Sequence, residues 1–475
     1  MKKNSVYRIV LKILGAVLFA AILFCLGLFT AYRIYLISKE KPQSTYLPNK
    51  VVLSESNLPI IIIDTKGEIS SMRRDKYITA RMIVIDNGTG NINYVDTVSH
   101  KQYITYDGLI NLRYRGNTTF SVDKKSYSVN LIASAKGDKQ KAKLLDMKKS
   151  DKWCLLAEHR DLTLMRDALT YELARPFFDY VPNYRYCEVI LDGDYMGVYL
   201  LAERITRDRL GLKKFDNTDD RLYNGYLLEK DHDNEISFYS RYSLYDPNPN
   251  AVNKKAGFAI KYPKPNLLTF EQLQTIKDDV IRLEDAINTK DYKIYSQYID
   301  VESFLSFHLF QEFTNNPDGY IFSHKFYHRD GLFYMTLWDF DIAYGKMTYR
   351  NGLYVNTWQY DCDGIFWWHQ LEQDSVFRSM ISERWLSIRD GALSRDVIER
   401  KIDSLQTLLA SHGAIDRNMK AWGTGNFDGE IVFLKSWINC RLDFMDLSLL
   451  NKPHDKIMCD EACCQVGRNT LYKKL

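Results

Sequence analysis

The segment Trp338-Asp339-Phe340-Asp341 places two acidic residues between bulky apolar ones, and Gly345 follows soon after. The residues just before it, 331–337, have the composition of a β-strand. A pair of carboxylates at the end of a strand, with a glycine close behind, suits a divalent cation that bridges phosphate oxygens. The alternative interpretation is that Asp339 and Asp341 only cap a turn.

Another acid, Asp318, lies upstream on a predicted tight turn formed by residues 315–320. Phosphoryl transfer needs one acid near the attacking group and another acid on the metal ion. The spacing therefore favours Asp318 for the first role and the later pair of acids for the second role.

The elements that must position these acids differ between the two halves of the chain. The first half has short β-branched or alternating runs that predict strands, at 58–64, 80–86, 109–115, 126–132, 185–191, 195–202 and 225–230. One helix is predicted over 162–177, with Thr163 as its cap and Asp167 in its first turn. The fold class is therefore α+β, with a β-rich N-terminal part.

The second half is predicted to be mostly helical. Residues 232–266 are polar and contain four prolines, which indicates a loop or an excursion between lobes. Thr269 and Gln272 have the spacing of a capping box at the start of the next helix. Further helices are predicted at 301–313, 376–388, 397–409 and 431–447.

Composition bounds the class of protein. The chain has 475 residues, of which 45% are hydrophobic and 13% aromatic, so a packed interior is expected rather than disorder. The formal net charge is only +4. No large basic field is present, which argues against a nucleic acid as the partner.

The N-terminus predicts a membrane anchor. Residues 1–12 are basic, and residues 13–32 form an apolar run about long enough to cross a bilayer as a helix. The charge ahead of this run predicts a cytoplasmic N-terminus, a single span, and a globular part outside the cytoplasm. Residues 33–57 then form a linker. A cleaved signal peptide is the competing interpretation, but the apolar run is long for one.

Cysteine and histidine patterns give no metal site of a familiar kind. Four scattered cysteines are expected to be buried thiols: Cys154, Cys187, Cys362 and Cys440. The tail, 449–475, carries three more, for which a disulfide is favoured over a metal: Cys459, Cys463 and Cys464. His308, His324, His328, His369 and the adjoining pair Trp367-Trp368 are interpreted as packing or surface residues.

Taken together, residues 58–448 resemble the CotH family of kinase-like spore-coat proteins. The resemblance rests on the order and spacing of a series of motifs rather than on any single one. They are Arg115-Gly116-Asn117, Lys124-Lys125-Ser126-Tyr127, Trp153 to Ala157, Asp161 to Asp167, Gly193 to Tyr199, Glu203, Asn316-Pro317-Asp318 and Trp338-Asp339-Phe340-Asp341.

The resemblance implies a bilobal, atypical protein kinase fold that uses ATP with Mg²⁺ or Mn²⁺ and phosphorylates Ser or Thr hydroxyls of a protein. It implies that Asp318 accepts the proton of the hydroxyl and that Asp341, beside Asp339, binds the metal. A lysine of the pair Lys124-Lys125 would contact phosphate. Strand alternation places Lys125 on the face of Tyr127, so Lys125 is favoured and Lys124 stays open.

The other implied residues are Glu203, which would pair with that lysine, and two arginines, Arg115 and Arg166, which would contact phosphate or hold the fold. Many family members have an asparagine five residues after the turn acid as a second metal ligand, and here Ser323 occupies that position. A hydroxyl is a poorer ligand for a hard cation than an amide oxygen. The alternative function is therefore a weak or inactive kinase-fold protein with a binding, adhesion or structural role in the cell envelope.

Overall fold

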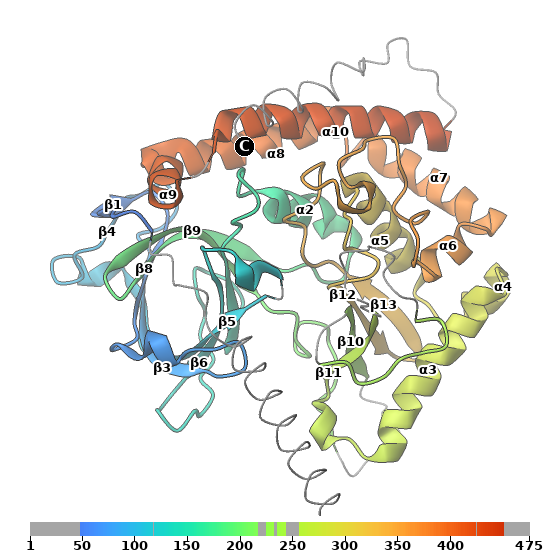
Figure 1. Ribbon diagram of the computed structural model, residues 1–475, viewed down its shortest axis with the longest axis horizontal. Coiled ribbons are helices and arrows are strands. Elements are labelled where there is room, and N and C mark those ends of the chain that lie inside the picture. Colours follow the sequence, from blue (N-terminus) through green and yellow to red (C-terminus); the bar gives the residue numbers. More distant parts are fainter. Residues whose placement is uncertain are drawn as a thin grey trace, which may run out of the picture. The chain divides into compact units, whose positions relative to one another are not determined.

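The computed structural model describes residues 48–116, 118–216, 225–231, 235–243, 256–423 and 425–450. All of them lie in one compact unit that begins at Pro48. The strands come mainly first in the chain and the helices mainly last, which confirms the predicted α+β class (Figure 1).

The N-terminal part is a closed β-barrel. Its strands, in their order around the barrel, are β2 (Ile60–Asp64), β3 (Ile78–Ile85), β5 (Ile104–Arg115), β6 (Ser126–Ile132), β7 (Lys152–Leu156), β9 (Asp194–Glu203) and β8 (Tyr184–Leu191). Every neighbouring pair is antiparallel except β2 and β8, which run parallel and close the barrel. Closure removes the exposed edges that an open sheet of this length would have.

A second sheet of four antiparallel strands follows, in the order β11 (Gly257–Tyr262), β10 (Tyr226–Asp231), β12 (His324–Arg329) and β13 (Leu332–Thr336). The prediction that residues 232–266 are only an irregular excursion is therefore wrong for β11. Its residues form a strand because they pair with β10, a contact that the local composition does not reveal.

The helices are α2 (Arg166–Ala174), α3 (Phe270–Asn288), α4 (Tyr292–Tyr295), α5 (Val301–Thr314), α6 (Trp367–Leu371), α7 (Ser375–Arg389), α8 (Arg395–Ala410), α9 (Ala414–Trp422) and α10 (Phe427–Leu450). Short pieces complete the fold: β1 (Glu55–Ser56), β4 (Asn93–Tyr94) and the 3₁₀ turns η1 (Glu68–Ser71), η2 (Lys101–Tyr103), η3 (Thr118–Ser121), η4 (Arg175–Phe177), η5 (Pro265–Leu267), η6 (Tyr349–Asn351) and η7 (Ser411–Gly413). The capping box of Thr269 and Gln272 is confirmed at the start of α3.

Helix α2 begins later than predicted, at Arg166, and Thr163 is not its cap. The carboxylate of Asp161 instead accepts hydrogen bonds from the backbone N–H groups of Thr163, Met165 and Arg166, at 2.9, 2.9 and 2.7 Å. A carboxylate satisfies these first N–H groups better than a hydroxyl because it is charged and has more acceptor positions.

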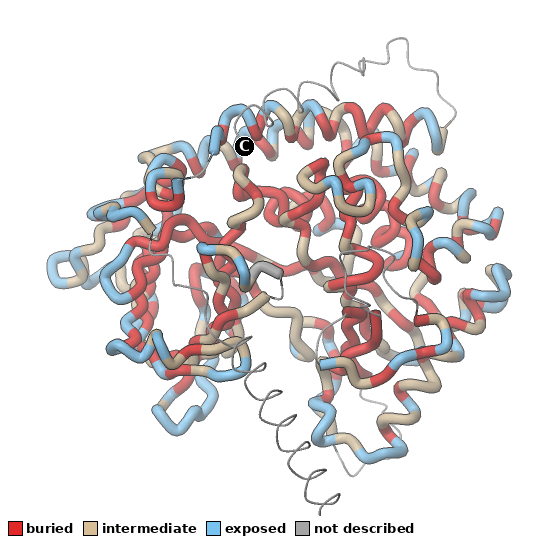
Figure 2. Tube along the Cα trace, in the orientation of Figure 1, coloured by how far each residue is buried: buried red, intermediate tan, exposed pale blue. Residues whose placement is uncertain are grey.

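Two large hydrophobic clusters support the site. One fills the barrel, and the other joins α2, α5, the second sheet and the C-terminal helices. Figure 2 shows β9 and α5 almost entirely buried. Trp367, Trp368 and His324 are buried in the second part, which confirms their packing role.

Several predictions concern the ends of the chain. The predicted anchor at 13–32 and the tail at 451–475 lie outside the described residues. Within the described residues, no helix is both long and apolar enough to cross a bilayer. Cys154 and Cys187 are buried free thiols, as expected, and Cys362 is a free thiol but only half-buried. Cys440 is disulfide-bonded, so the prediction of a thiol there is wrong.

Candidate active site

The turn that carries Asp318 is fixed by the end of α5. Asn315 ends the helix with a left-handed backbone, φ 46°. The backbone N–H groups of Ile321 and Phe322 then donate to the carbonyl of Asp318, at 2.9 and 2.8 Å. A Cβ on Gly319 would lie 1.8 Å from a side-chain oxygen of Gln311, so only glycine fits there. These contacts leave the carboxyl group of Asp318 half-buried at the surface of the turn.

The second acidic turn follows β13 and is tied to the first. The side-chain amide of Asn316 donates to the carbonyl of Asp339 at 3.0 Å. The backbone N–H of Phe340 donates to the carboxylate of Asp167 on α2, at 2.7 Å. Residues from α5, β13 and α2 are therefore joined, and Asp318 lies close enough to Asp341 to affect its ionisation.

The carboxylates of this cluster repel one another. Burial raises the pKa of Asp341 well above its usual range, and the charges of Asp339 and Asp167 raise it further. Burial raises the pKa of Asp167 to about 7, with Asp339 the next cause. Burial likewise raises the pKa of Glu158, again with help from Asp167. A bound cation would relieve this repulsion by favouring the charged forms.

The donor set fits Mg²⁺ or Mn²⁺ held partly by a nucleotide. In the part of the chain that the structure describes, no three acidic, histidine or cysteine side chains form a ready metal cage. Mg²⁺ does not need one, because it usually keeps several waters and binds one or two carboxylates plus phosphate oxygens. Asp339 and Asp341 can supply those carboxylates. Ser323, the third predicted ligand, donates its hydroxyl to Asp339 at 2.6 Å.

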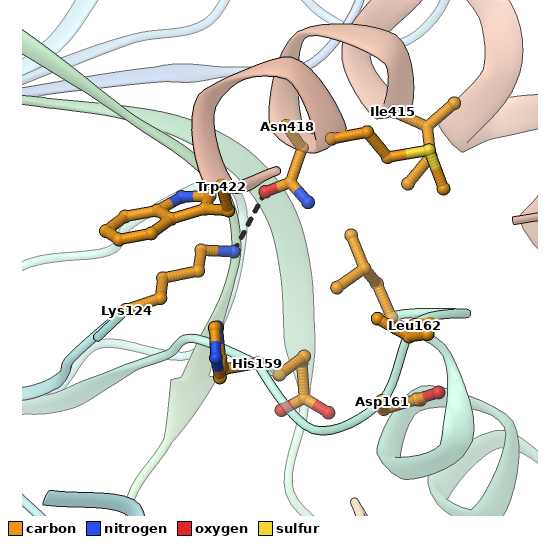
Figure 3. A pocket seen from close by; sticks show the side chains of 10 residues that line it. Lys124, His159, Asp161, Leu162, Ile415, Asn418 and Trp422 are labelled. Carbon is orange, nitrogen blue, oxygen red and sulfur yellow. Dashed lines mark hydrogen bonds between the residues drawn. The ribbon is translucent and has the colours of Figure 1, made fainter. Parts of the chain in front are cut away.

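The two candidate lysines differ in how many donors remain available. Lys124 is 1% exposed, and its amine donates to the carbonyl of Ala157 at 2.8 Å, to Oδ1 of Asn418 at 3.0 Å and to the carbonyl of Val198 (Figure 3). An ammonium group has three N–H donors, so Lys124 has none left for a phosphate in this arrangement.

Lys125 keeps its donors available. Its amine is half-buried and donates to the carbonyl of Phe120 at 2.6 Å, and the described residues provide no other acceptor for it. It also lies over the ring of Phe120, with 5.0 Å between the amine and the ring centre. The structure therefore leaves Lys125 as the candidate with free capacity for an anion.

Glu203 does not pair with either lysine. Its carboxylate lies 2.7 Å from the guanidinium of Arg209 and accepts hydrogen bonds from the side chains of Asn183 and Tyr180, at 3.1 and 3.2 Å. Glu203 is the last residue of β9, and Arg209 follows six positions later. The expected Lys–Glu pair is absent because this nearby arginine takes up the carboxylate.

The two arginines have different surroundings. Arg166 is fully buried, forms an ion pair with Asp161 and donates to the carbonyl of Ala343 at 3.0 Å, contacts that hold the fold. Arg115 instead lies over the ring of Trp338, at 5.0 Å, and also contacts the sulfur of Cys154. Arg115 therefore stands beside the acidic turn.

Sequence reasoning missed several charged residues of this region. Glu158 and Asp167 join the acidic cluster, and Arg160 is the cation that opposes the rise in the pKa of Asp341. Lys325 lies over Trp338 at 5.8 Å and forms an ion pair with Glu229. An acid in the first turn of α2 was visible in the sequence, but its contact with Phe340 was not.

Two comparisons with known proteins bear on this site. The sequence profile of the CotH kinase protein family matches residues 112–445, which include both acidic turns and both lysines. The inner spore coat protein H of Bacillus subtilis (strain 168) is 22% identical over 239 residues. That alignment covers 50% of this chain and 59% of the relative, so the chain spans somewhat more than half of that relative's length.

Proposed function

The chain belongs to the CotH family, and we propose that it transfers the γ-phosphoryl group of ATP to a Ser or Thr hydroxyl of a protein outside the cytoplasm. The observation that carries the proposal is the link between the two acidic turns through Asn316 and the carbonyl of Asp339. This link brings a candidate proton acceptor and a candidate pair of metal ligands from separate elements to one place, as phosphoryl transfer requires.

Each residue then has a defined task. Asp318 accepts the proton as the acceptor oxygen bonds to the γ-phosphorus and the bond to the ADP oxygen breaks. Asp341 and Asp339 hold the divalent cation, which supplies positive charge to the phosphate oxygens when bound. Lys125 donates to a phosphate oxygen, and Arg115 lies over Trp338 where the nucleotide would enter. Positioning and positive charge provide most of the stabilisation of this transition state, and groups of these types provide both.

The location is proposed from the sequence. Residues 13–32 would anchor the chain by a single span, with residues 33–57 as the linker to the kinase-like part. The relative named above is called an inner spore coat protein, and a place outside the cytoplasm for this chain agrees with that name.

A second candidate function is a cell-envelope binding protein that keeps the fold without the chemistry. One observation favours it: Ser323 occupies the position where many family members have an asparagine, and its hydroxyl donates to Asp339. Under this proposal the chain would bind its partner without turning over ATP.

A phosphotransfer assay separates the two functions. The full chain in detergent is incubated with γ-labelled ATP and Mg²⁺ or Mn²⁺, and label is followed in the chain itself and in a generic acceptor protein. We expect label that is lost in Asp318→Asn and Asp341→Asn while the melting temperature is kept. Asp330→Asn is the matched control, because Asp330 is exposed at a hairpin turn away from the site. Absence of label and of ATP binding with either metal would favour the binding protein.

A further inference from the structure

Helix α9 docks closely on the barrel strand β9, although the two lie far apart in the sequence (Figure 1). The contact is centred on Gly197, whose φ of 93° favours glycine. A Cβ at this position would lie 2.4 Å from Oδ1 of Asn418. The absence of a side chain at Gly197 therefore lets Asn418 reach the strand.

Three polar contacts fix the helix there. Oδ1 of Asn418 accepts a hydrogen bond from the backbone N–H of Val198 at 3.0 Å. The indole N–H of Trp422 donates to the carbonyl of Met196 at 2.9 Å. Arg417 donates to both oxygens of the buried Glu188, at 2.9 and 2.7 Å. Bonds on successive turns of one helix set both its place and its rotation.

The same Oδ1 atom of Asn418 also holds Lys124, at 3.0 Å. Lys124 thus joins the segment after β7, strand β9 and helix α9 through Ala157, Val198 and Asn418. Figure 3 shows the amine of Lys124 directed at Asn418 beneath Trp422. A buried amine without these acceptors would be costly, so the three elements are held together as a unit.

Two residues of the candidate site directly follow residues of this junction in the chain. Lys125 follows Lys124 directly in the chain, and Glu158 follows Ala157. Oε2 of Glu158 accepts no hydrogen bond from the described residues, and Glu158 lines a small pocket together with Lys124, Asn418 and Trp422 (Figure 3).

We propose that Asn418 is a positioning residue of the nucleotide site. Acting through Lys124, it fixes the positions of Lys125 and Glu158. The packing of α9 on β9 therefore governs the affinity for Mg²⁺–ATP. The part of this inference that concerns ATP rests on the proposed function. The junction itself rests only on the contacts described above.

The test uses three variants of the full chain. Asn418→Ala removes the acceptor for Lys124, and Asn418→Asp keeps an oxygen in the same place. Asp416→Ala changes an exposed residue of the same helix and serves as the control. Acetylation of Lys124 by N-hydroxysuccinimidyl acetate, measured by peptide mass spectrometry, reports on the junction without any nucleotide. Calorimetric titration with Mg²⁺–ATP reports on the site, and thermal melting shows that each variant is folded.

We expect acetylation of Lys124 to rise about tenfold in Asn418→Ala and the affinity for Mg²⁺–ATP to fall by about the same factor, because the variant loses the buried hydrogen bonds that Asn418 accepts from Lys124 and Val198. Asp416→Ala should behave like the parent chain in both measurements, and Asn418→Asp should neither raise acetylation of Lys124 nor weaken binding of Mg²⁺–ATP, because its carboxylate still accepts from Lys124. Unchanged acetylation in Asn418→Ala would overturn the junction, whether or not ATP binds. Increased acetylation with unchanged affinity would overturn the positioning role. A parent chain that binds no ATP would overturn the proposed function and the positioning role with it, while the acetylation result would still decide the junction.

Discussion

Ser323 donates a hydrogen bond of 2.6 Å to Oδ2 of Asp339, and both residues have left-handed backbones, with φ of 51° and 72°. Left-handed residues other than glycine cost roughly 1–2 kcal/mol each, so two together at one turn mark a site whose geometry is held by its surroundings. The serine therefore orients Asp339 and leaves its other carboxylate oxygen for a cation.

The first prediction concerns Ser323 itself. Ser323→Ala removes the hydrogen bond that orients Asp339, so the Mg²⁺ concentration needed for half-maximal ATP binding should rise about fivefold. Ser323→Asn should lower it instead, because asparagine tolerates a left-handed backbone and offers an amide oxygen to the metal. Titration of ATP binding against Mg²⁺ measures both. Equal values in all three chains would show that residue 323 has no part in metal binding.

The second prediction concerns Asp318. Because Asp318 is half-buried on a turn that backbone hydrogen bonds hold, Asp318→Asn should preserve the turn and remove the proton acceptor. The rate of phosphotransfer should fall by about 10²–10⁴, the usual share of general base catalysis, while the affinity for Mg²⁺–ATP stays within about twofold. Single-turnover labelling and calorimetry measure the two quantities separately. If the affinity for Mg²⁺–ATP fell as much as the rate of phosphotransfer, Asp318 would act in nucleotide binding rather than as the proton acceptor.

Much of this site was predictable because its signals are local. A strand followed by acids, and a turn with Asn, Pro and Gly, can be identified within a few residues, and Asp318, Asp339 and Asp341 were chosen as candidates in this way. The strands of the barrel were predicted from β-branched runs or from alternation, except β7. The capping box of α3 depends on two residues three positions apart, and it was also predicted correctly.

The remainder depends on contacts between distant parts of the chain. Closure of the barrel needs the parallel pairing of β2 with β8, and β11 exists because it pairs with β10. The partner of Glu203 was assigned to a lysine, but Arg209 takes its place. One of the three hydrogen bonds that the amine of Lys124 donates goes to Asn418, nearly 300 positions away. No local pattern could have shown these pairings.

The third prediction concerns pH. Burial, and after it the charge of Asp339, raise the pKa of Asp167 to about 7. Burial, and after it the charges of Asp339 and Asp167, raise the pKa of Asp341 well above its usual range. A folded-state pKa above the unfolded value means that this cluster stabilises the metal-free chain most at low pH. That contribution is lost as the pH rises through about 7. Mg²⁺ needs the ionised carboxylates, so its binding should release protons and strengthen with pH.

The measurement is the shift in melting temperature that Mg²⁺ causes, recorded from about pH 6 to about pH 8, the range that brackets the raised pKa of Asp167. The shift should grow as the pH rises in the parent chain. It should be small at every pH in Asp341→Asn, which lacks a proposed metal ligand. A shift that is independent of pH in the parent chain would contradict the proposed role of the acidic cluster in metal binding.

The fourth prediction separates the two arginines. Arg166→Met leaves the buried carboxylate of Asp161 without its cation, so the free energy of unfolding should fall by about 3–5 kcal/mol. Arg115→Met removes a contact with the ring of Trp338 at the acidic turn, so it should weaken Mg²⁺–ATP binding with a smaller effect on stability. Urea unfolding and calorimetric titration measure the two effects. If Arg166→Met weakened Mg²⁺–ATP binding without lowering the free energy of unfolding, Arg166 would be a ligand contact rather than a structural residue.

The fifth prediction separates the two lysines. Lys125 has donors to spare, so Lys125→Met should raise the KM for ATP by about tenfold or more and leave the free energy of unfolding nearly unchanged, because the side chain is half-buried. Lys124 donates to acceptors on three elements, so Lys124→Met should change stability and should affect ATP only through the displaced neighbours.

The dependence of stability on pH gives Lys124 an independent signature. Burial lowers the pKa of Lys124 to about 7, below its unfolded value. The folded chain therefore holds this proton less tightly than the unfolded chain, and Lys124 makes its largest contribution to stability when it is neutral in both states. Relative to Lys124→Met, the parent chain should gain stability as the pH rises from about 7 to about 10. Burial also lowers the pKa of the half-buried Lys125, so the parent chain should show a smaller slope of the same sign relative to Lys125→Met. Urea unfolding across this range measures the difference, and a flat profile for Lys124→Met relative to the parent chain would mean that Lys124 is not buried as the contacts with Ala157, Val198 and Asn418 require.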